Sequence, residues 1–132
     1  MSPVSKPGIK VVAVLHDLIF ETKIRSTVAA FEGTTGVARS ADEFRKIVEE
    51  SAPSIVVVDL NHLASKPEDL AELVRAVPAD SKVVAYCSHV DHALMKWAKE
   101  AGIGLVMPRS RFSLDWAAIL EGVTRSMAEQ QR

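Results

Sequence analysis

The sequence predicts one α/β domain, an open and doubly wound sheet of parallel strands with helices on both faces. Strand-like and helix-like segments alternate five times along the chain. The strand-like segments are continuous apolar runs such as Ile55-Val56-Val57-Val58, which is typical of parallel strands that helices cover on both sides. Because crossovers between parallel strands are right-handed, the alternation favours a doubly wound sheet. For five units we expect the flavodoxin-like strand order 2-1-3-4-5.

Local patterns give each element in turn. The expected strands cover residues 9–15, about 35–39, 54–59, 82–86 and 104–107. The expected helices cover about 18–31, Ser40 to before Pro53, Ser65 to before Pro78, about 90–101 and about 114–128. Asp17 is suited to cap the first helix, and Gly102 is suited to the C′ position of the fourth. Ser40-Ala41-Asp42-Glu43 and Ser65-Lys66-Pro67-Glu68 have the capping-box pattern, which predicts helix starts.

Composition narrows the class of protein. The chain has 132 residues, 48% of them hydrophobic, with a net charge of −1 and one cysteine. We expect a leader over 1–8, one domain over 9–128 and a frayed end over 129–132. The near-neutral charge predicts neither nucleic acid nor membrane as a partner. A single cysteine excludes an internal disulfide and fits the cytoplasm, and no apolar stretch is long enough to span a bilayer.

Two acids follow two strands that are neighbours in the expected order. His16-Asp17 comes directly after the first strand, and Asp59 ends the third. The carboxyl ends of parallel strands meet at one edge, and ligands bind there where the strand order reverses. The pair therefore predicts a site, although Asp17 can also serve only as a helix cap and Asp59 only as a solvated strand-end residue.

From about residue 9 to 124 the chain resembles the receiver domain of bacterial response regulators, in the chemotaxis-type single-domain form. Four features carry the resemblance: the acid after the first strand, Ile24 seven residues beyond Asp17, Val57-Val58-Asp59-Leu60, and Ala101-Gly102 before the fifth strand. The resemblance implies that the third-strand aspartate accepts a phosphoryl group. It also implies that paired acids after the first strand help to bind Mg²⁺, that a Thr or Ser ends the fourth strand, and that a Lys ends the fifth.

The chain departs from this pattern at several positions. His16 stands where the family has a second acid, which predicts a weak Mg²⁺ site formed by His16, Asp17 and Asp59. Cys87 stands at the hydroxyl position, with Ser88 one residue away, and Arg109 stands at the lysine position. We therefore assign Asp59 as the phospho-acceptor position and treat Cys87, Ser88 and Arg109 as switch positions. Arg109 is expected either to pair with Asp59 or to bind an anion.

These departures favour a pseudo-receiver, a signalling domain that works by protein–protein contact with phosphotransfer lost or reduced. One alternative is a working single-domain response regulator phosphorylated on Asp59. Another is a small metal-dependent enzyme on the same fold, in which the four histidines and Asp91 join Asp17 and Asp59 around a transition metal. Cys87 can also be simply a small buried apolar residue.

A protein partner of a signalling pathway is expected, bound by a monomer or a homodimer. Leu18 and Ile19 follow Asp17 but lie outside the apolar stripe that begins at Phe20. Trp97 lies at the edge of the stripe of the fourth helix. If these side chains are exposed, partner binding is the expected reason. For Trp97, use in the core is the competing interpretation.

Overall fold

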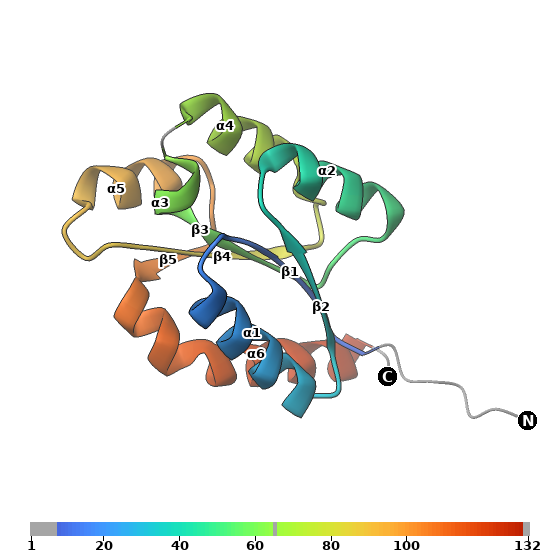
Figure 1. The fold of residues 1–132 in the computed structure, drawn as a ribbon. Coiled ribbons are helices and arrows are strands. Elements are labelled where there is room, and N and C mark those ends of the chain that lie inside the picture. The colour runs from blue at the N-terminus through green and yellow to red at the C-terminus, as the bar shows by residue number, and fades with distance from the viewer. Residues whose placement is uncertain (1–7, 65, 131–132) are drawn as a thin grey trace, which may run out of the picture.

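The computed structural model describes residues 8–64 and 66–130 and has five strands in one sheet (Figure 1). The elements in chain order are β1 (Lys10–Val14), α1 (Leu18–Ala30), β2 (Thr34–Ala38), α2 (Ala41–Glu50), β3 (Ile55–Asp59), α3 (Leu60–Leu63), α4 (Pro67–Ala76), β4 (Lys82–Cys87), α5 (His92–Glu100), β5 (Leu105–Pro108) and α6 (Arg109–Gln130). All strand pairs are parallel and the order is β2-β1-β3-β4-β5. The predicted fold class and strand order are confirmed.

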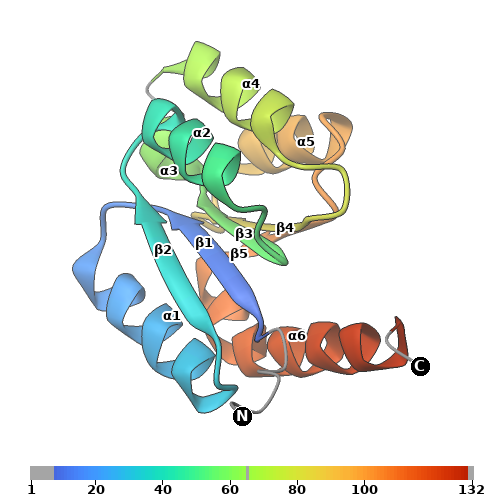
Figure 2. The same cartoon turned by 90° about the vertical axis from the view of Figure 1, so that its right-hand side faces the viewer.

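Helices cover both faces of the sheet (Figures 1 and 2). Helices α2, α3, α4 and α5 lie on one face, and α1 and α6 lie on the other. Each face has its own buried cluster. The cluster under α2–α5 is mostly aliphatic, whereas the cluster under α1 and α6 contains Tyr86, Phe112 and Trp116. None of the described helices is long and apolar enough to cross a membrane.

Strand β3 lies in the middle of the sheet, and all five of its residues are buried. Successive side chains of a strand point to opposite faces. Val56 and Val58 accordingly belong to the cluster under α2–α5, and Ile55 and Val57 to the cluster under α1 and α6. Asp59 is the next residue in this alternation, and its register partner on β4 is Tyr86. Asp59 and Tyr86 are therefore neighbours on the α1–α6 side.

Several predicted helix ends are confirmed. Asp17 caps α1, and Ser40 caps α2 by accepting a hydrogen bond from the Glu43 N–H at 3.1 Å. Gly102 follows α5 with a φ of +93°, the left-handed region that favours glycine. The predicted helix starting after Ser65 is present as α4, but Lys66 is its N-cap residue and makes no capping hydrogen bond. Ser65 lies outside the described residues, as do 1–7 of the expected leader and 131–132 of the expected frayed end.

Two helical segments differ from the prediction. The short helix α3 is not among the predicted elements, and the Asp59 carboxylate caps it. Helix α6 begins at Arg109, about five residues earlier than predicted, directly after Pro108. Phe112 adds a turn to the apolar stripe, because it stacks on Trp116 four residues later at a ring distance of 5.1 Å. The helix also continues through Gln130, so residues 129–130 are helical.

Candidate functional site

The carboxyl ends of β1, β3, β4 and β5 bring the predicted site residues to one edge of the sheet. Asp17 follows β1, Asp59 ends β3 and Arg109 follows β5. The charges of all three act on the hydroxyl of Tyr86, near the end of β4. Burial is the largest cause that raises the pKa of this hydroxyl, and the two carboxylates raise it further. The expected convergence of Asp17, Asp59 and Arg109 at this edge is therefore present.

Asp59 is buried, with 6% of its surface exposed. One carboxylate oxygen, Oδ1, accepts hydrogen bonds from the N–H groups of Asn61 at 3.1 Å and His62 at 3.3 Å. Burial raises the pKa of the Asp59 carboxyl, and the His62 N–H and the Arg109 charge offset part of this rise. The interpretation of Asp59 as a solvated strand-end residue is wrong, because this carboxylate is held inside the fold.

Asp17 is exposed and caps α1. Its Oδ1 accepts hydrogen bonds from the N–H groups of Ile19 at 2.8 Å and Phe20 at 3.2 Å. His16 beside it is exposed and stacks on His62, with ring centroids 5.9 Å apart. Among the described residues, no three His, Cys, Asp or Glu side chains are grouped so as to hold a metal ion. This finding does not support the alternative of a transition-metal site built from the histidines and Asp91.

Arg109 does not pair with Asp59. In the described part of the chain, no carboxylate lies within 4.0 Å of the Arg109 guanidinium. The guanidinium instead lies over the rings of Phe20 at 5.7 Å and Tyr86 at 6.0 Å, within reach of a cation–π interaction. The expected ion pair is therefore wrong: the guanidinium lies over the ring of Tyr86, the β4 residue that is the register partner of Asp59.

The two residues proposed for the hydroxyl position have different surroundings. Cys87 is buried in the cluster under α2–α5. Its thiol pKa is raised, first by burial and then by the charges of Asp91 and Asp59. A raised pKa disfavours the reactive thiolate at neutral pH. Ser88 lies beside Arg109, and both line one pocket.

Asn61 is a site residue that sequence reasoning missed. Its side-chain carbonyl accepts a hydrogen bond from the Ser88 N–H at 2.6 Å, and its amide donates to Asp91 at 3.2 Å. Asn61 thus ties the segment after β3 to the segment after β4. The only signal in the sequence was its place two residues after Asp59.

Arg39 is a second residue that was missed. Its guanidinium donates to the Leu15 carbonyl at 3.0 Å and to Glu21 at 2.6 Å, and its own carbonyl lies 2.7 Å from Nε2 of His62. The Arg39 hydrogen bond is the largest cause that lowers the pKa of the Glu21 carboxyl. Arg39 therefore fixes the segments that follow β1, β2 and β3 against one another. No spacing rule pairs position 39 with positions 21 and 62.

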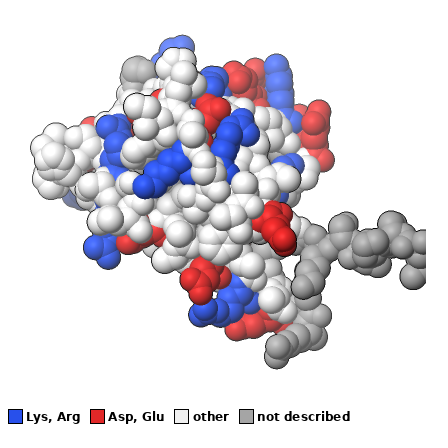
Figure 3. Space-filling model, turned by 60° about the horizontal axis from the view of Figure 1, so that its bottom comes forward, with Lys and Arg blue, Asp and Glu red and all other residues white. Residues whose placement is uncertain are grey.

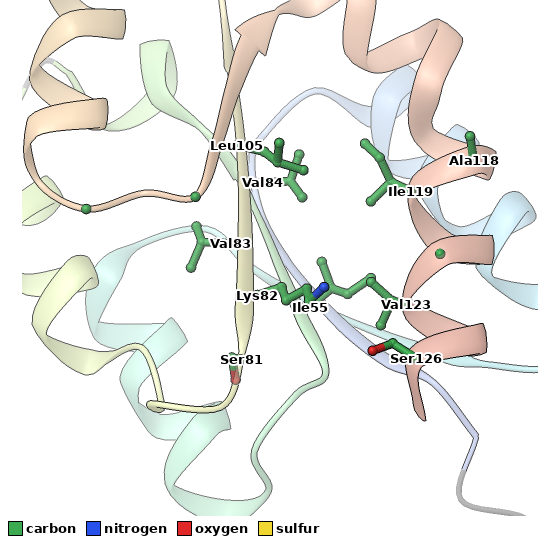
Figure 4. Close-up of a pocket in the computed structure, with 13 residues that line it drawn as sticks. Ile55, Ser81, Lys82, Val83, Val84, Leu105, Ala118, Ile119, Val123 and Ser126 are labelled. Atoms are coloured by element: carbon green, nitrogen blue, oxygen red, sulfur yellow. The ribbon is translucent and has the colours of Figure 1, made fainter. Parts of the chain in front are cut away.

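Two of the hollows in the described chain lie beside helix α6. The first, at the carboxyl edge, has a volume of about 530 Å³ and is lined by Phe20, Ser88, His89, Arg109, Ser110 and Ser113. The second, of about 690 Å³, lies between the strands β4 and β5 and helix α6, where Val84 and Leu105 face Ile119 (Figure 4). The second hollow extends to Ser81 and Lys82 at the start of β4, so it opens toward the end of the sheet opposite Asp59.

The predicted interaction residues are exposed to different degrees. Leu18 and Ile19, in the first turn of α1, are 68% and 80% exposed. Trp97 on α5 is 36% exposed. Leu18 and Ile19 therefore lie free at the carboxyl edge, whereas most of Trp97 is covered.

Solved structures of receiver proteins match this fold. A response regulator receiver protein from Burkholderia phymatum aligns with a TM-score of 0.69 and 18% identity, over 87% of this chain and 94% of that one. A CheY-like protein, TadZ, from Pseudomonas aeruginosa aligns with 0.68 and 18%, over 87% and 98%. The chain has the receiver fold.

Another match is a response regulator from Burkholderia pseudomallei, described with a phosphorylated aspartic acid, a calcium ion and citrate. It aligns with a TM-score of 0.67 and 16% identity, over 92% of this chain and 72% of that one. No protein-family model matches the sequence, and no curated protein does. Identities this low show a shared fold and leave the activity of this receiver-like chain to be argued from its own residues.

Proposed function

We propose that this chain is a receiver-like signalling domain of the cytoplasm that acts through contact with a protein partner, with phosphotransfer at Asp59 lost or much reduced. The observation that carries the proposal is the environment of Asp59. Its carboxylate is buried, accepts two backbone N–H groups, and has no cationic side chain within ion-pair distance among the described residues.

Phosphoryl transfer to a carboxylate needs positive charge close to the transferred group. The carboxylate oxygen attacks phosphorus while the bond to the leaving oxygen breaks, and negative charge spreads over the three other oxygens. Arg109, the residue in the lysine position, is stacked on Phe20 and Tyr86. The cation that would quench this charge is therefore held away from Asp59.

The donor set fits Mg²⁺ poorly. This ion prefers carboxylate oxygens in octahedral geometry. Asp17 and Asp59 each use Oδ1 to cap a helix, and His16, in the position of a further acid, stacks on His62. A neutral imidazole suits softer metals better than Mg²⁺. We therefore expect Mg²⁺ to bind in the millimolar range or more weakly.

The alternative is a working response regulator that carries a phosphoryl group on Asp59. Its support is the position of Asp59 at the end of β3, the nearby acid Asp17, and the likeness to the Burkholderia pseudomallei protein described with a phosphorylated aspartic acid. The raised pKa of the Asp59 carboxyl, caused first by burial, does not separate the two functions, because burial of this carboxyl is common to both.

Intact-mass spectrometry separates them. The full chain is incubated with acetyl phosphate and Mg²⁺, alongside the Asp59→Asn variant and a receiver that accepts phosphate as a positive control. The proposal expects both forms of this chain to keep their mass while the positive control gains one phosphoryl group. A gain in a substantial fraction of molecules that Asp59→Asn abolishes would establish the alternative.

A further inference from the structure

The pocket at the carboxyl edge has a chemically distinctive lining. Arg109, at the start of α6, contributes a guanidinium. Three serines and His89 contribute hydrogen-bonding groups, and no acidic side chain lines the pocket. Lys23 of α1 donates to Ser113 at 2.6 Å, which places a second cation at the rim. This combination favours an anionic ligand.

The charge of Arg109 is not used inside the molecule. The guanidinium lies over the rings of Phe20 and Tyr86, and no carboxylate of the described residues pairs with it. Other arginines in the described chain do pair: Arg39 with Glu21, and Arg125 with Glu121. A guanidinium that pairs with no carboxylate in the described chain keeps its planar fork of N–H donors available for a carboxylate of a ligand.

Exposed apolar side chains lie close in sequence to the residues that line this pocket. Six large apolar residues are exposed in the described chain, and four of them, at 68–80% exposure, lie within two positions of pocket-lining residues in sequence. Leu18 and Ile19 precede Phe20, Val90 follows His89, and Leu114 follows Ser113. Exposed apolar groups around a polar pocket are typical of a surface that binds another protein.

The surface charge indicates what kind of segment fits. Figure 3 shows several basic side chains gathered in the upper part of the view, with acidic side chains mostly around and below them. One guanidinium matches one carboxylate in a bidentate pair, whereas recognition of phosphorylated segments commonly uses a cluster of arginines. Arg109 is the one arginine that lines this pocket.

We propose that this pocket is the docking site for a segment of a protein partner in which an Asp or Glu side chain binds Arg109 and neighbouring apolar side chains rest on Leu18, Ile19 and Leu114. The inference rests on the proposed function, because it names the contact surface of a domain that works by contact. The proposed docking site lies on the α6 side of Tyr86, and Asp59 is not part of it.

Selection from a random library of displayed eight-residue peptides against the immobilised full chain tests the site. Selected peptides should carry an acidic residue next to Leu, Ile or Phe. One selected peptide is then synthesised in three forms: as selected, with its acidic residue changed to the amide, and with phosphoserine in that place. Fluorescence anisotropy measures the affinity of each form.

Arg109→Gln should weaken binding of the acidic peptide at least tenfold, about 1.4 kcal/mol. It should leave binding of the amide form unchanged. Arg109→Lys keeps the charge but not the fork and should give a smaller loss. Ile19→Ser should weaken both forms. The matched control is Arg125→Gln on the same helix, whose guanidinium is paired with Glu121 and which should change affinity less than twofold.

Several results would overturn the inference. These are selected peptides without acidic residues, an absence of selected peptides, an affinity unchanged by Arg109→Gln, and a preference of tenfold or more for the phosphoserine form. The mass experiment tests the proposed function independently of this docking site. Phosphorylation of Asp59 together with Arg109-dependent peptide binding would remove the proposed function and keep this site, whereas an unchanged mass with Arg109-independent binding would remove only the site.

Discussion

The two halves of the carboxyl edge differ in what their polar groups contact. In the β1–β3 half, which contains His16, Asp17, Asp59 and His62, both carboxylates accept backbone N–H groups and Arg39 holds the loops together. In the β4–β5 half, which contains Tyr86, Ser88 and Arg109, the guanidinium is unpaired and the buried Tyr86 hydroxyl has no partner among the described residues. We call the first half closed, because one oxygen of each carboxylate caps a helix, and the second half open, because its guanidinium pairs with no carboxylate of the described residues.

Asn61 joins the two halves, so removing it gives the largest expected effect. Asn61→Ala leaves the Ser88 N–H and the Asp91 carboxylate without their partner. A partly buried group left unpaired costs about 1–3 kcal/mol, and we expect the free energy of unfolding to fall by about 2 kcal/mol. Asn61→Asp keeps the acceptor for Ser88 but sets a second carboxylate against Asp91, so it should lose at least as much. Urea denaturation measures both, and a loss under 0.5 kcal/mol for Asn61→Ala would show that the halves are held together by other contacts.

Asp59→Asn tests whether burial of the ionised Asp59 carboxylate lowers the stability of the folded protein. The folded-state pKa of Asp59 is raised above its ordinary value of 3.8, so the folded protein holds this proton more tightly than the unfolded chain does. The contribution of this group to stability is complete below about pH 3.8 and is lost as the pH rises through the folded pKa. Asparagine caps helices as well as aspartate, and we expect a gain of about 1 kcal/mol at pH 7.

The same gain should shrink as the pH approaches 3.8, where Asp59 of the wild type is protonated. Asp17→Asn is the matched control, because Asp17 is a cap of the same kind but exposed. It should change stability by less than about 0.5 kcal/mol. Thermal unfolding at several pH values measures both variants, and a destabilised Asp59→Asn at pH 7 would mean that a cation stabilises the ionised carboxylate.

Tyr86→Phe tests whether the Tyr86 hydroxyl of the open half lacks a hydrogen-bond partner, and its expected effect on stability is smaller. The Tyr86 hydroxyl is buried and has no hydrogen-bond partner among the described residues, and a buried polar group without a partner is costly. Its removal should raise stability by about 0.5 kcal/mol while the aromatic stack with Phe112, at 4.9 Å, is kept. A loss of 1 kcal/mol or more would indicate that the hydroxyl bonds to Asp59, Asp17 or an ordered water.

Arg109→Gln should have the smallest effect on stability. The side chain is exposed and pairs with no carboxylate in the described chain, so the expected change in the free energy of unfolding is within about 0.5 kcal/mol. Arg39→Gln is the comparison from the closed half, because it loses the Leu15 and Glu21 contacts and should cost about 1 kcal/mol. Equal losses in the two variants would remove the distinction between the halves.

The fold could be predicted from the sequence because its signals are local and repeated. Continuous apolar runs gave the strands, and Asp17, Ser40 and Gly102 marked the helix ends. The convergence of Asp17, Asp59 and Arg109 followed from the strand order alone. Helix α3 was missed because four residues carry no periodic pattern, and they become helical only where Asp59 caps them.

The contacts within the site could not be predicted, because they depend on which side chain occupies the space between two strands. Tyr86 reads as one more apolar strand residue, yet it lies beside Asp59 in the register and its ring is one of the two over which the Arg109 guanidinium lies. Arg39 and Asn61 act across 18 to 30 positions of sequence. Pairs so far apart leave no periodicity in a single sequence.

A Mg²⁺ titration of the full chain, followed by the backbone amide resonances of Asn61 and His62, tests the central claim most directly. Both amides donate to the Asp59 carboxylate, so their resonances report whether this carboxylate still accepts the two hydrogen bonds when Mg²⁺ is added. The account predicts that neither resonance moves at sub-millimolar Mg²⁺ and that weak, non-saturating shifts appear only at about millimolar concentrations. Stoichiometric binding at micromolar Mg²⁺ that shifts both amides and that Asp17→Ala abolishes would contradict it.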